Sequence, residues 1–290
     1  MNFTAAAPEG SIIYLEGVTV DFDGFKALHD LNFFMDYREL RVVIGPNGAG
    51  KTTLLDVISG KVQPAAGRVI FGKHTELSGR RENEIASLGI GRKFQTPSVF
   101  ANLSVRENLE LSLARPSKGV MATLRSRLDA GQRARVEETL ETIGLGGRGA
   151  ERAGGLSHGE KQWLEIGMVI VQQAELLLVD EPVAGMTDEE TARTAALLQS
   201  VARERAVLVI EHDMEFVRSL ARKVTVMHEG RVLCEGSVDE VQRDERVREV
   251  YLGRSRSRAA ATRWLMVTMS WTCLMTRPSR PSVSLPDSAC

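Results

Sequence analysis

A glycine-rich segment directly after an apolar run constrains this chain most. Residues 45–52 read GPNGAGKT and follow the apolar stretch 40–44. The pattern G-x-x-x-x-G-K-[ST] is typical of a loop that turns backbone N–H groups toward a phosphate at the start of a helix. We expect Lys51 to reach the β- and γ-phosphates and the Thr52 hydroxyl to bind Mg²⁺. The sequence therefore predicts a P-loop that binds a nucleoside triphosphate through Gly45, Pro46, Asn47, Gly48, Ala49, Gly50, Lys51, Thr52 and Thr53.

A second group of chemically active residues follows apolar runs in the C-terminal half. Residues 176–179 are Leu-Leu-Leu-Val, which indicates a strand buried on both faces, and Asp180 ends that strand. A carboxylate at the C-terminal end of such a strand suits Mg²⁺ beside the phosphates. Glu181, one residue further, suits a base that polarises the attacking water. His212, which follows the run 207–210, can reach the γ-phosphate.

Strand and helix signals alternate over most of the chain. Capping boxes at Ser104–Glu107, Thr187–Glu190 and Ser237–Glu240 mark helix starts. This alternation predicts an α/β fold with a parallel-rich sheet and helices on both faces. Strands are expected at 12–15, 18–20, 41–44, 67–71, 90–95, 176–179, 207–210 and 224–227, and helices fill about 104–170, with breaks near Gly119, Gly131 and 144–155.

Composition excludes several classes of protein. The net charge of -1 gives no argument for a nucleic-acid partner, and the three cysteines have no metal-ligand spacing. The first ten residues lack a signal-peptide pattern, and no apolar run reaches the length of a spanning helix, so we expect a cytoplasmic protein. Residues 255–290 carry five arginines and one aspartate without cap or period signals. We expect a disordered extension there; a segment that touches the membrane surface and a regulatory module are the alternatives.

The motifs and their order resemble the ATP-binding cassette (ABC) ATPases over residues 11–254. The match consists of the P-loop, Gln95, the segment 156–162, Asp180-Glu181 and His212. The resemblance implies a P-loop NTPase core with an N-terminal antiparallel β subdomain and an α-helical subdomain at about 100–170. It also implies ATP as the nucleotide, and Gln95 as a residue that senses Mg²⁺ and water and adjoins transmembrane subunits.

The same resemblance implies that two cassettes pair head to tail around ATP. Ser157, Gly159 and Glu160 would then contact the nucleotide held by the partner cassette. His158 and Glu160 replace the glycine and glutamine of the usual L-S-G-G-Q signature, and residues 184–187 depart from the common D-loop. Phe22 would stack on the adenine, with Phe25 as the alternative.

Three segments give a finer resemblance, to importers of branched-chain amino acids and in particular to urea-import ATPase subunits. These are residues 91–100, 156–167 and 181–188. The resemblance implies an ATP-hydrolysing subunit on the cytoplasmic face of the membrane. Its partners would be transmembrane permease subunits, a second ABC ATPase that is identical or different, and, indirectly, a periplasmic solute-binding protein.

Two other classes of function are disfavoured by features that the sequence lacks. An ABC ATPase of DNA repair would carry a long coiled-coil insert, and one of translation would usually carry two cassettes in one chain. A GTPase would need an N-K-x-D motif, which does not occur. Transport remains the favoured function, with an ABC ATPase of translation or repair as the alternative.

Overall fold

The computed structural model describes residues 8, 10–93, 99–113 and 128–253. The chain divides into two units, Met1–Asp244 and Glu245–Cys290. In the second unit the described part is a single helix, α10, Glu245–Gly253. All other described helices and strands belong to the first unit.

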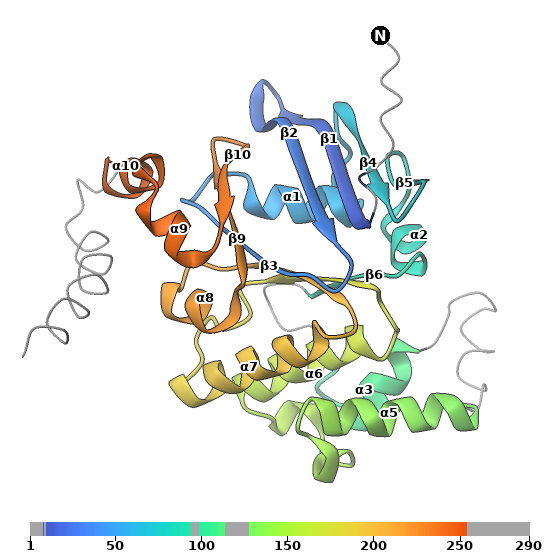
Figure 1. The fold of residues 1–290 in the computed structure, drawn as a ribbon. Coiled ribbons are helices and arrows are strands. Elements are labelled where there is room, and N and C mark those ends of the chain that lie inside the picture. The colour runs from blue at the N-terminus through green and yellow to red at the C-terminus, as the bar shows by residue number, and fades with distance from the viewer. Residues whose placement is uncertain (1–7, 9, 94–98, 114–127, 254–290) are drawn as a thin grey trace, which may run out of the picture. The chain divides into compact units, whose positions relative to one another are not determined.

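An antiparallel sheet of four strands forms one layer of the first unit (Figure 1). The sequence predicted two short strands at 12–15 and 18–20, but the structure has one strand, β1. A bulge between Leu15 and Val18, where Gly17 has a φ of 60°, interrupts the alternating pattern without ending the strand. The sheet order is β2-β1-β4-β5, formed by Phe25–Asp36, Ser11–Phe22, Ala66–Phe71 and Thr75–Glu76.

A mixed sheet of six strands forms the second layer, in the order β10-β9-β3-β8-β7-β6. Neighbouring strands are parallel except for the pair β9 and β10. Every residue of β7 and β8 is buried, which confirms the interpretation of their apolar runs. The strands are Leu40–Ile44 (β3), Ile90–Lys93 (β6), Leu176–Asp180 (β7), Ala206–Ile210 (β8), Lys223–His228 (β9) and Arg231–Gly236 (β10).

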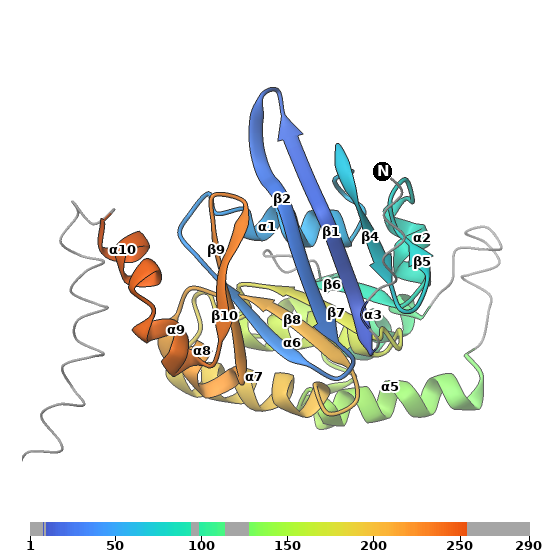
Figure 2. The same ribbon diagram turned by 45° about the horizontal axis from the view of Figure 1, so that its top comes forward.

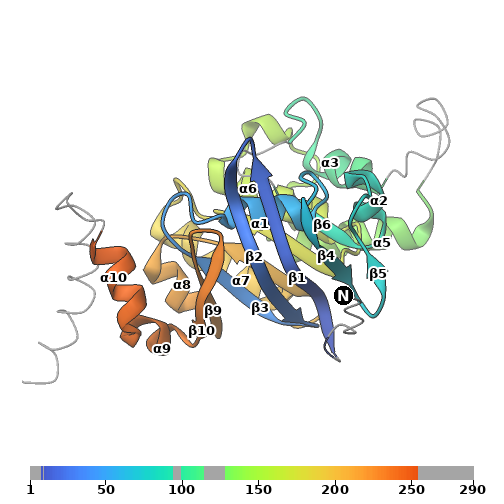
Figure 3. The same ribbon diagram turned by 90° about the horizontal axis from the view of Figure 1, so that it is seen from above.

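The helix that follows the P-loop, α1, Lys51–Ile58, lies between the two sheets (Figures 2 and 3). Its side chains Leu54, Leu55, Val57 and Ile58 share one buried apolar cluster with residues of both sheets. Burial of apolar surface in this shared cluster stabilises the packing of the two layers against α1. The start of α1, and the P-loop before it, are therefore fixed by the core.

The remaining helices include the expected helical layer. Helices α3 and α5 pack against α6 and against each other. A helix boundary lies near Gly131, as predicted, because the capping box formed by Asp129 and Gln132 starts α5 at Ala130; the predicted break near Gly119 lies outside the described residues. No described helix is both long and apolar enough to cross a bilayer. The bounds are Glu82–Ser87 (α2), Val105–Ser112 (α3), Ala130–Thr142 (α5), His158–Ile170 (α6), Asp188–Val201 (α7), Met214–Leu220 (α8) and Val238–Arg243 (α9).

A fully buried cation, Arg41, joins β3, the strand that leads to the P-loop, to the adjacent strand β9 and to β10 beyond it. Its Nε lies 2.6 Å from Glu39 Oε1, and its Nη1 lies 2.7 Å from Glu235 Oε1 of β10. The same Nη1 donates to Thr225 Oγ1 of β9 over 3.2 Å. A buried charge is tolerated only with partners of this kind, so the sheet depends on the whole cluster.

We expect Arg41→Ala to lower the free energy of unfolding by about 3–5 kcal/mol, because two carboxylates lose their buried counter-charge. Denaturant unfolding of the full chain measures the change. Arg106→Ala is the matched control, since its half-exposed guanidinium pairs with the exposed Glu137, and it should cost less than about 1 kcal/mol. Equal losses in the two variants would show that the buried cluster has no special role.

Candidate functional site

Three adjacent parallel strands end at the same level of the mixed sheet. Ile210 of β8 pairs with Val43 of β3 on one side and with Asp180 of β7 on the other. The P-loop, Glu181 and the segment that begins at residue 211 all follow directly from these positions. The register therefore brings the predicted phosphate, metal and water-activating residues to one end of the sheet, which is the usual ligand position in α/β folds.

The P-loop requires glycine at two positions because other parts of the backbone approach it closely. A Cβ on Gly45 would lie 2.3 Å from the carbonyl oxygen of Met227, and one on Gly50 would lie 2.6 Å from that of Ala27. Gly50 also has a φ of 95°, which glycine adopts without strain. Asn47 and Gly48 form the exposed tip of the loop, while Ala49 is buried beneath it.

Lys51 is the first residue of α1, and its ammonium group points back into the P-loop. Nζ donates to the carbonyl oxygens of Gly45 over 2.7 Å and Pro46 over 3.1 Å. Burial lowers the pKa of Lys51, while the charges of Glu181 and Asp180 oppose that shift. The ammonium group is thus held where an anion entering the loop would meet it.

The neighbouring side chains fit a magnesium ion that is shared with phosphate. Thr52 is exposed at the start of α1, and Asp180 is buried at the end of β7. Burial raises the pKa of Asp180, and the charge of Arg92 opposes that shift. No group of three His, Cys, Asp or Glu residues that could hold a metal occurs in the part of the chain that is described. One carboxylate and one hydroxyl suit Mg²⁺, which usually keeps phosphate oxygens and water as its other ligands.

Glu181 and His212, which the sequence predicts separately for water activation and for the γ-phosphate, lie beside each other. The Oε1 atom of Glu181 is 3.4 Å from Nδ1 of His212, and the Glu181 N–H donates to the carbonyl oxygen of Ile210 over 3.0 Å. Glu181 has a φ of 43°, a conformation that turns the chain sharply away from β7. The His212 side chain is 65% exposed, so it is open to a ligand.

The sequence analysis missed Glu211, a buried carboxylate that fixes the loops around these two residues. Its Oε2 accepts from the backbone N–H groups of His212 (2.8 Å) and Asp213 (3.2 Å), and its Oε1 accepts from that of Val183 (3.4 Å). Burial raises the pKa of Glu211, while these N–H groups oppose the shift. A carboxylate directly after the fully apolar run 207–210 was the available signal.

Two ion pairs that the sequence analysis also missed hold the end of β6, the strand before Gln95. Arg92 Nη1 lies 2.6 Å from Asp56 Oδ1 of α1, and Lys93 Nζ lies 3.7 Å from Glu165 Oε2 of α6. Burial lowers the pKa of Lys93, and the charge of Glu165 is the largest opposing effect. Gln95 itself, predicted for magnesium and catalysis, lies outside the described residues.

The signature residues begin helix α6. Ser157 is the N-cap, and its hydroxyl accepts from the Glu160 N–H over 3.2 Å while Glu160 Oε2 accepts from the Ser157 N–H over 2.9 Å. The other carboxylate oxygen of Glu160 pairs with Arg148. Both oxygens of Glu160 are therefore engaged within the chain, and its predicted contact with nucleotide stays a prediction.

The predicted adenine-stacking residue stands at the tip of the β1–β2 hairpin. Phe22 pairs with Phe25 across that hairpin, and the two rings are 48% and 63% exposed. Exposed aromatic rings at a turn are available for stacking. The structure leaves both residues as candidates.

The fold and site define a P-loop nucleotide-hydrolysing protein with a phosphate loop, a strand-end carboxylate and an adjacent glutamate–histidine pair. Residues 28–184 match the ABC transporter family. Residues 231–256 match the family described as branched-chain amino acid ATP-binding cassette transporter. The chain belongs to the ABC transporter family and is an ATP-hydrolysing subunit of that family.

This chain aligns with individual relatives over nearly their whole length. The high-affinity branched-chain amino acid transport ATP-binding protein LivG of Salmonella typhimurium is 30% identical over 252 residues, which is 84% of this chain and 98% of LivG. BraF of Pseudomonas aeruginosa, of the same description, is 31% identical over 254 residues, with the same coverage. The structure of MJ1267, an ATP-binding cassette of an ABC transporter in its ADP conformation, has a TM-score of 0.75 and 27% identity, and covers 84% of this chain and 99% of that one. These matches confirm the predicted ABC ATPase fold.

We expect Asp180→Asn to stabilise the nucleotide-free protein at pH 7. Burial raises the pKa of Asp180 in the folded protein above its unfolded value of about 4. The folded protein therefore loses stability as pH rises from the unfolded pKa through the folded pKa, because the buried carboxyl group becomes charged. Asparagine carries no charge and avoids that loss. The advantage of the variant should vanish near pH 3, and its Mg²⁺-dependent affinity for ATP should fall roughly 10- to 100-fold.

Unfolding curves at the two pH values, with ATP titrations in Mg²⁺, measure both effects. Asp36→Asn, at an exposed position at the end of β2, is the control and should change neither quantity. A variant that is less stable than the wild type at pH 7 would contradict the argument.

Proposed function

We propose that this chain energises solute import as one of two paired cassettes on the cytoplasmic face of a membrane. The observation that supports the proposal is the common end of β3, β8 and β7, which brings the P-loop, Glu181 and His212 to one edge of the mixed sheet. The second cassette is either a copy of this chain or a related ABC ATPase, and permease subunits cross the membrane. A periplasmic solute-binding protein acts with them indirectly.

Within this proposal, the chain's own residues bind ATP and direct the attacking water. The P-loop N–H groups and the Lys51 ammonium bind the phosphates. Thr52 and Asp180 would hold Mg²⁺, which would neutralise part of the phosphate charge. Glu181 orients the water and accepts its proton as the water oxygen bonds to the γ-phosphorus. The bond from the γ-phosphorus to the bridging oxygen breaks, and ADP and phosphate leave. His212 donates to the γ-phosphate.

The remaining predicted residues have roles that depend on pairing or on the partners. Ser157 and Gly159 contact the ATP of the other cassette, and Glu160 supports them. Phe22, or Phe25 in its place, stacks on the adenine. Gln95 would be a ligand of Mg²⁺, and Phe100, whose side chain is 50% exposed, would belong to the surface that meets the permease.

For the solute, we propose branched-chain amino acids or urea. The match of residues 231–256 and the names of LivG and BraF support branched-chain amino acids. The resemblance of residues 91–100, 156–167 and 181–188 to urea-import subunits supports urea. An ATPase of this kind does not touch the solute, so uptake has to be measured. All relatives reported above are named as transport proteins, and no observation favours a role in translation or DNA repair.

We expect Glu181→Gln to bind ATP with an affinity within about twofold of the wild type and to lose turnover by roughly 100-fold or more, because it cannot accept the water's proton. Phosphate release and equilibrium ATP binding measure the two effects separately. Glu204→Gln, at an exposed site after α7, is the control. Normal turnover in Glu181→Gln would show that Glu181 is not the base.

We expect a mild-detergent affinity purification of the full chain to recover permease subunits and a second cassette. Reconstituted vesicles of that complex should take up labelled branched-chain amino acids or urea in an ATP-dependent manner, and the Glu181→Gln complex should take up neither. Recovery of ribosomes or repair factors instead would contradict transport. Uptake of only one of the two solutes would identify the class.

A further inference from the structure

The hydroxyl of Ser157 is already engaged within its own chain. Besides accepting from the Glu160 N–H over 3.2 Å, the Oγ atom donates to Oε1 of Glu190 over 3.1 Å. A serine hydroxyl has one proton to donate. Ser157 therefore cannot donate to a phosphate while it donates to Glu190.

Glu190 is held in position for this contact by the start of helix α7. Its Oε2 accepts from the N–H of Thr187 over 3.1 Å and from the Thr187 hydroxyl over 3.3 Å. These bonds lower the pKa of Glu190, and the bond from the Thr187 backbone N–H has the largest effect. A Cβ on Gly159 would lie 2.5 Å from Oε1, so the signature glycine makes room for the carboxylate.

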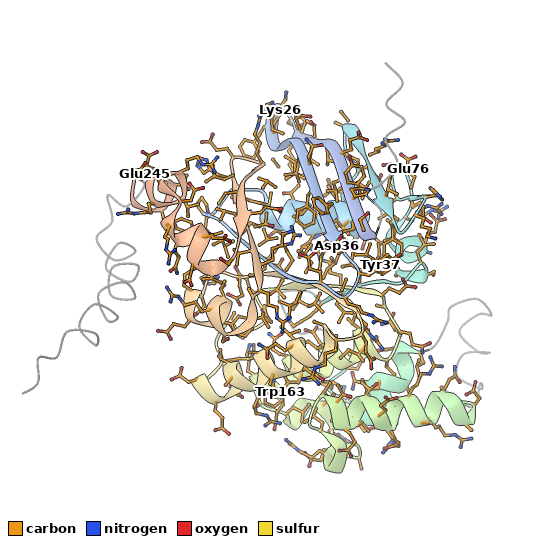
Figure 4. All side chains as sticks on the ribbon, viewed as in Figure 1. Lys26, Asp36, Tyr37, Glu76, Trp163 and Glu245 are labelled. Atoms are coloured by element: carbon orange, nitrogen blue, oxygen red, sulfur yellow. The ribbon has the colours of Figure 1, made fainter. Side chains whose placement is uncertain are left out.

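Helix α6 also contacts α7, and the loop before α7, at other residues. The ring Nε2 of His158 is 3.1 Å from the carbonyl oxygen of Ala184, in the loop before α7. Trp163, labelled on α6 in Figure 4, donates to Thr194 Oγ1 over 2.9 Å and lies under the guanidinium of Arg193 at 4.1 Å. These contacts can keep α6 beside α7 when the exposed bond between Ser157 and Glu190 breaks.

We infer that Glu190 is a positioning residue that competes with the partner cassette's ATP for the Ser157 hydroxyl. The inference rests on the proposed pairing. In the unpaired cassette the carboxylate holds the hydroxyl; on pairing, the γ-phosphate takes its place as acceptor. Because the bond to Glu190 must break before the hydroxyl can donate to the phosphate, it raises the ATP concentration needed for closure.

The carboxylate has a second function once Ser157 is released. Its bonds to Thr187 remain, so helix α7 keeps its cap. The change is thus confined to one hydrogen bond between the signature and the start of α7.

The test uses Glu190→Gln in the purified transporter complex. Glutamine at this cap position still accepts from the Thr187 N–H, so the helix start is retained while the negative charge is removed. The KM for ATP should fall about three- to tenfold, and kcat should stay within about twofold. Glu189→Gln removes the same charge from the same exposed helical turn and should leave both constants unchanged.

A second pair of variants separates this inference from the proposed function. In Ser157→Ala the hydroxyl is absent, so adding Glu190→Gln should lower KM by much less than in the wild type. An unchanged or raised KM in Glu190→Gln, or the same decrease with and without Ser157, would overturn the inference about Glu190 alone. If Ser157→Ala itself leaves ATP hydrolysis by the complex unchanged, the proposed pairing through Ser157 is wrong.

Discussion

The parallel register of β3, β8 and β7 is the constraint on which the site depends. Ile210 pairs with Val43 and with Asp180, so the three strands end together and their next residues face one ligand site. A slip of one residue would turn each strand's side chains to the opposite face. The register is specified strongly because β7 and β8 are buried at every position. The packing of the core and the geometry of the chemistry are thus set by the same backbone hydrogen bonds.

Much of this arrangement could be predicted because it is encoded locally. The P-loop, the strand that ends at Asp180 and the capping boxes at Ser104, Thr187 and Ser237 each depend on a few adjacent residues. The features that were missed depend on pairing at a distance. The bulge that continues β1 is decided by its neighbours β2 and β4, and the sequence pattern alone shows only an interruption. In the sequence, Glu211 looks like an ordinary charged residue. Only the structure shows that the loops after β7 and β8 both donate backbone hydrogen bonds to it.

Buried charge is distributed differently in the sheet and in the site. Arg41 has partners in β9, in β10 and at Glu39, just before its own strand, so its charge is compensated. Asp180 and Glu211 instead have raised pKa values, and Lys93 a lowered one, each with burial as the largest cause. Groups whose charged forms are disfavoured by burial gather where a nucleotide and a metal ion would add charge of both signs.

The start of helix α6 shows how one residue can serve both folding and function. The Ser157 hydroxyl caps the helix by accepting a hydrogen bond from the Glu160 N–H, and it can still donate its own proton to another acceptor. The same logic holds at the start of α7, where Thr187 caps the helix through Glu190 and leaves the second carboxylate oxygen for Ser157. Two capping boxes therefore meet through their spare hydrogen-bonding groups. A phosphate that accepts a hydrogen bond from the Ser157 hydroxyl disturbs neither cap. The contact between the two helices can therefore change without unfolding either of them.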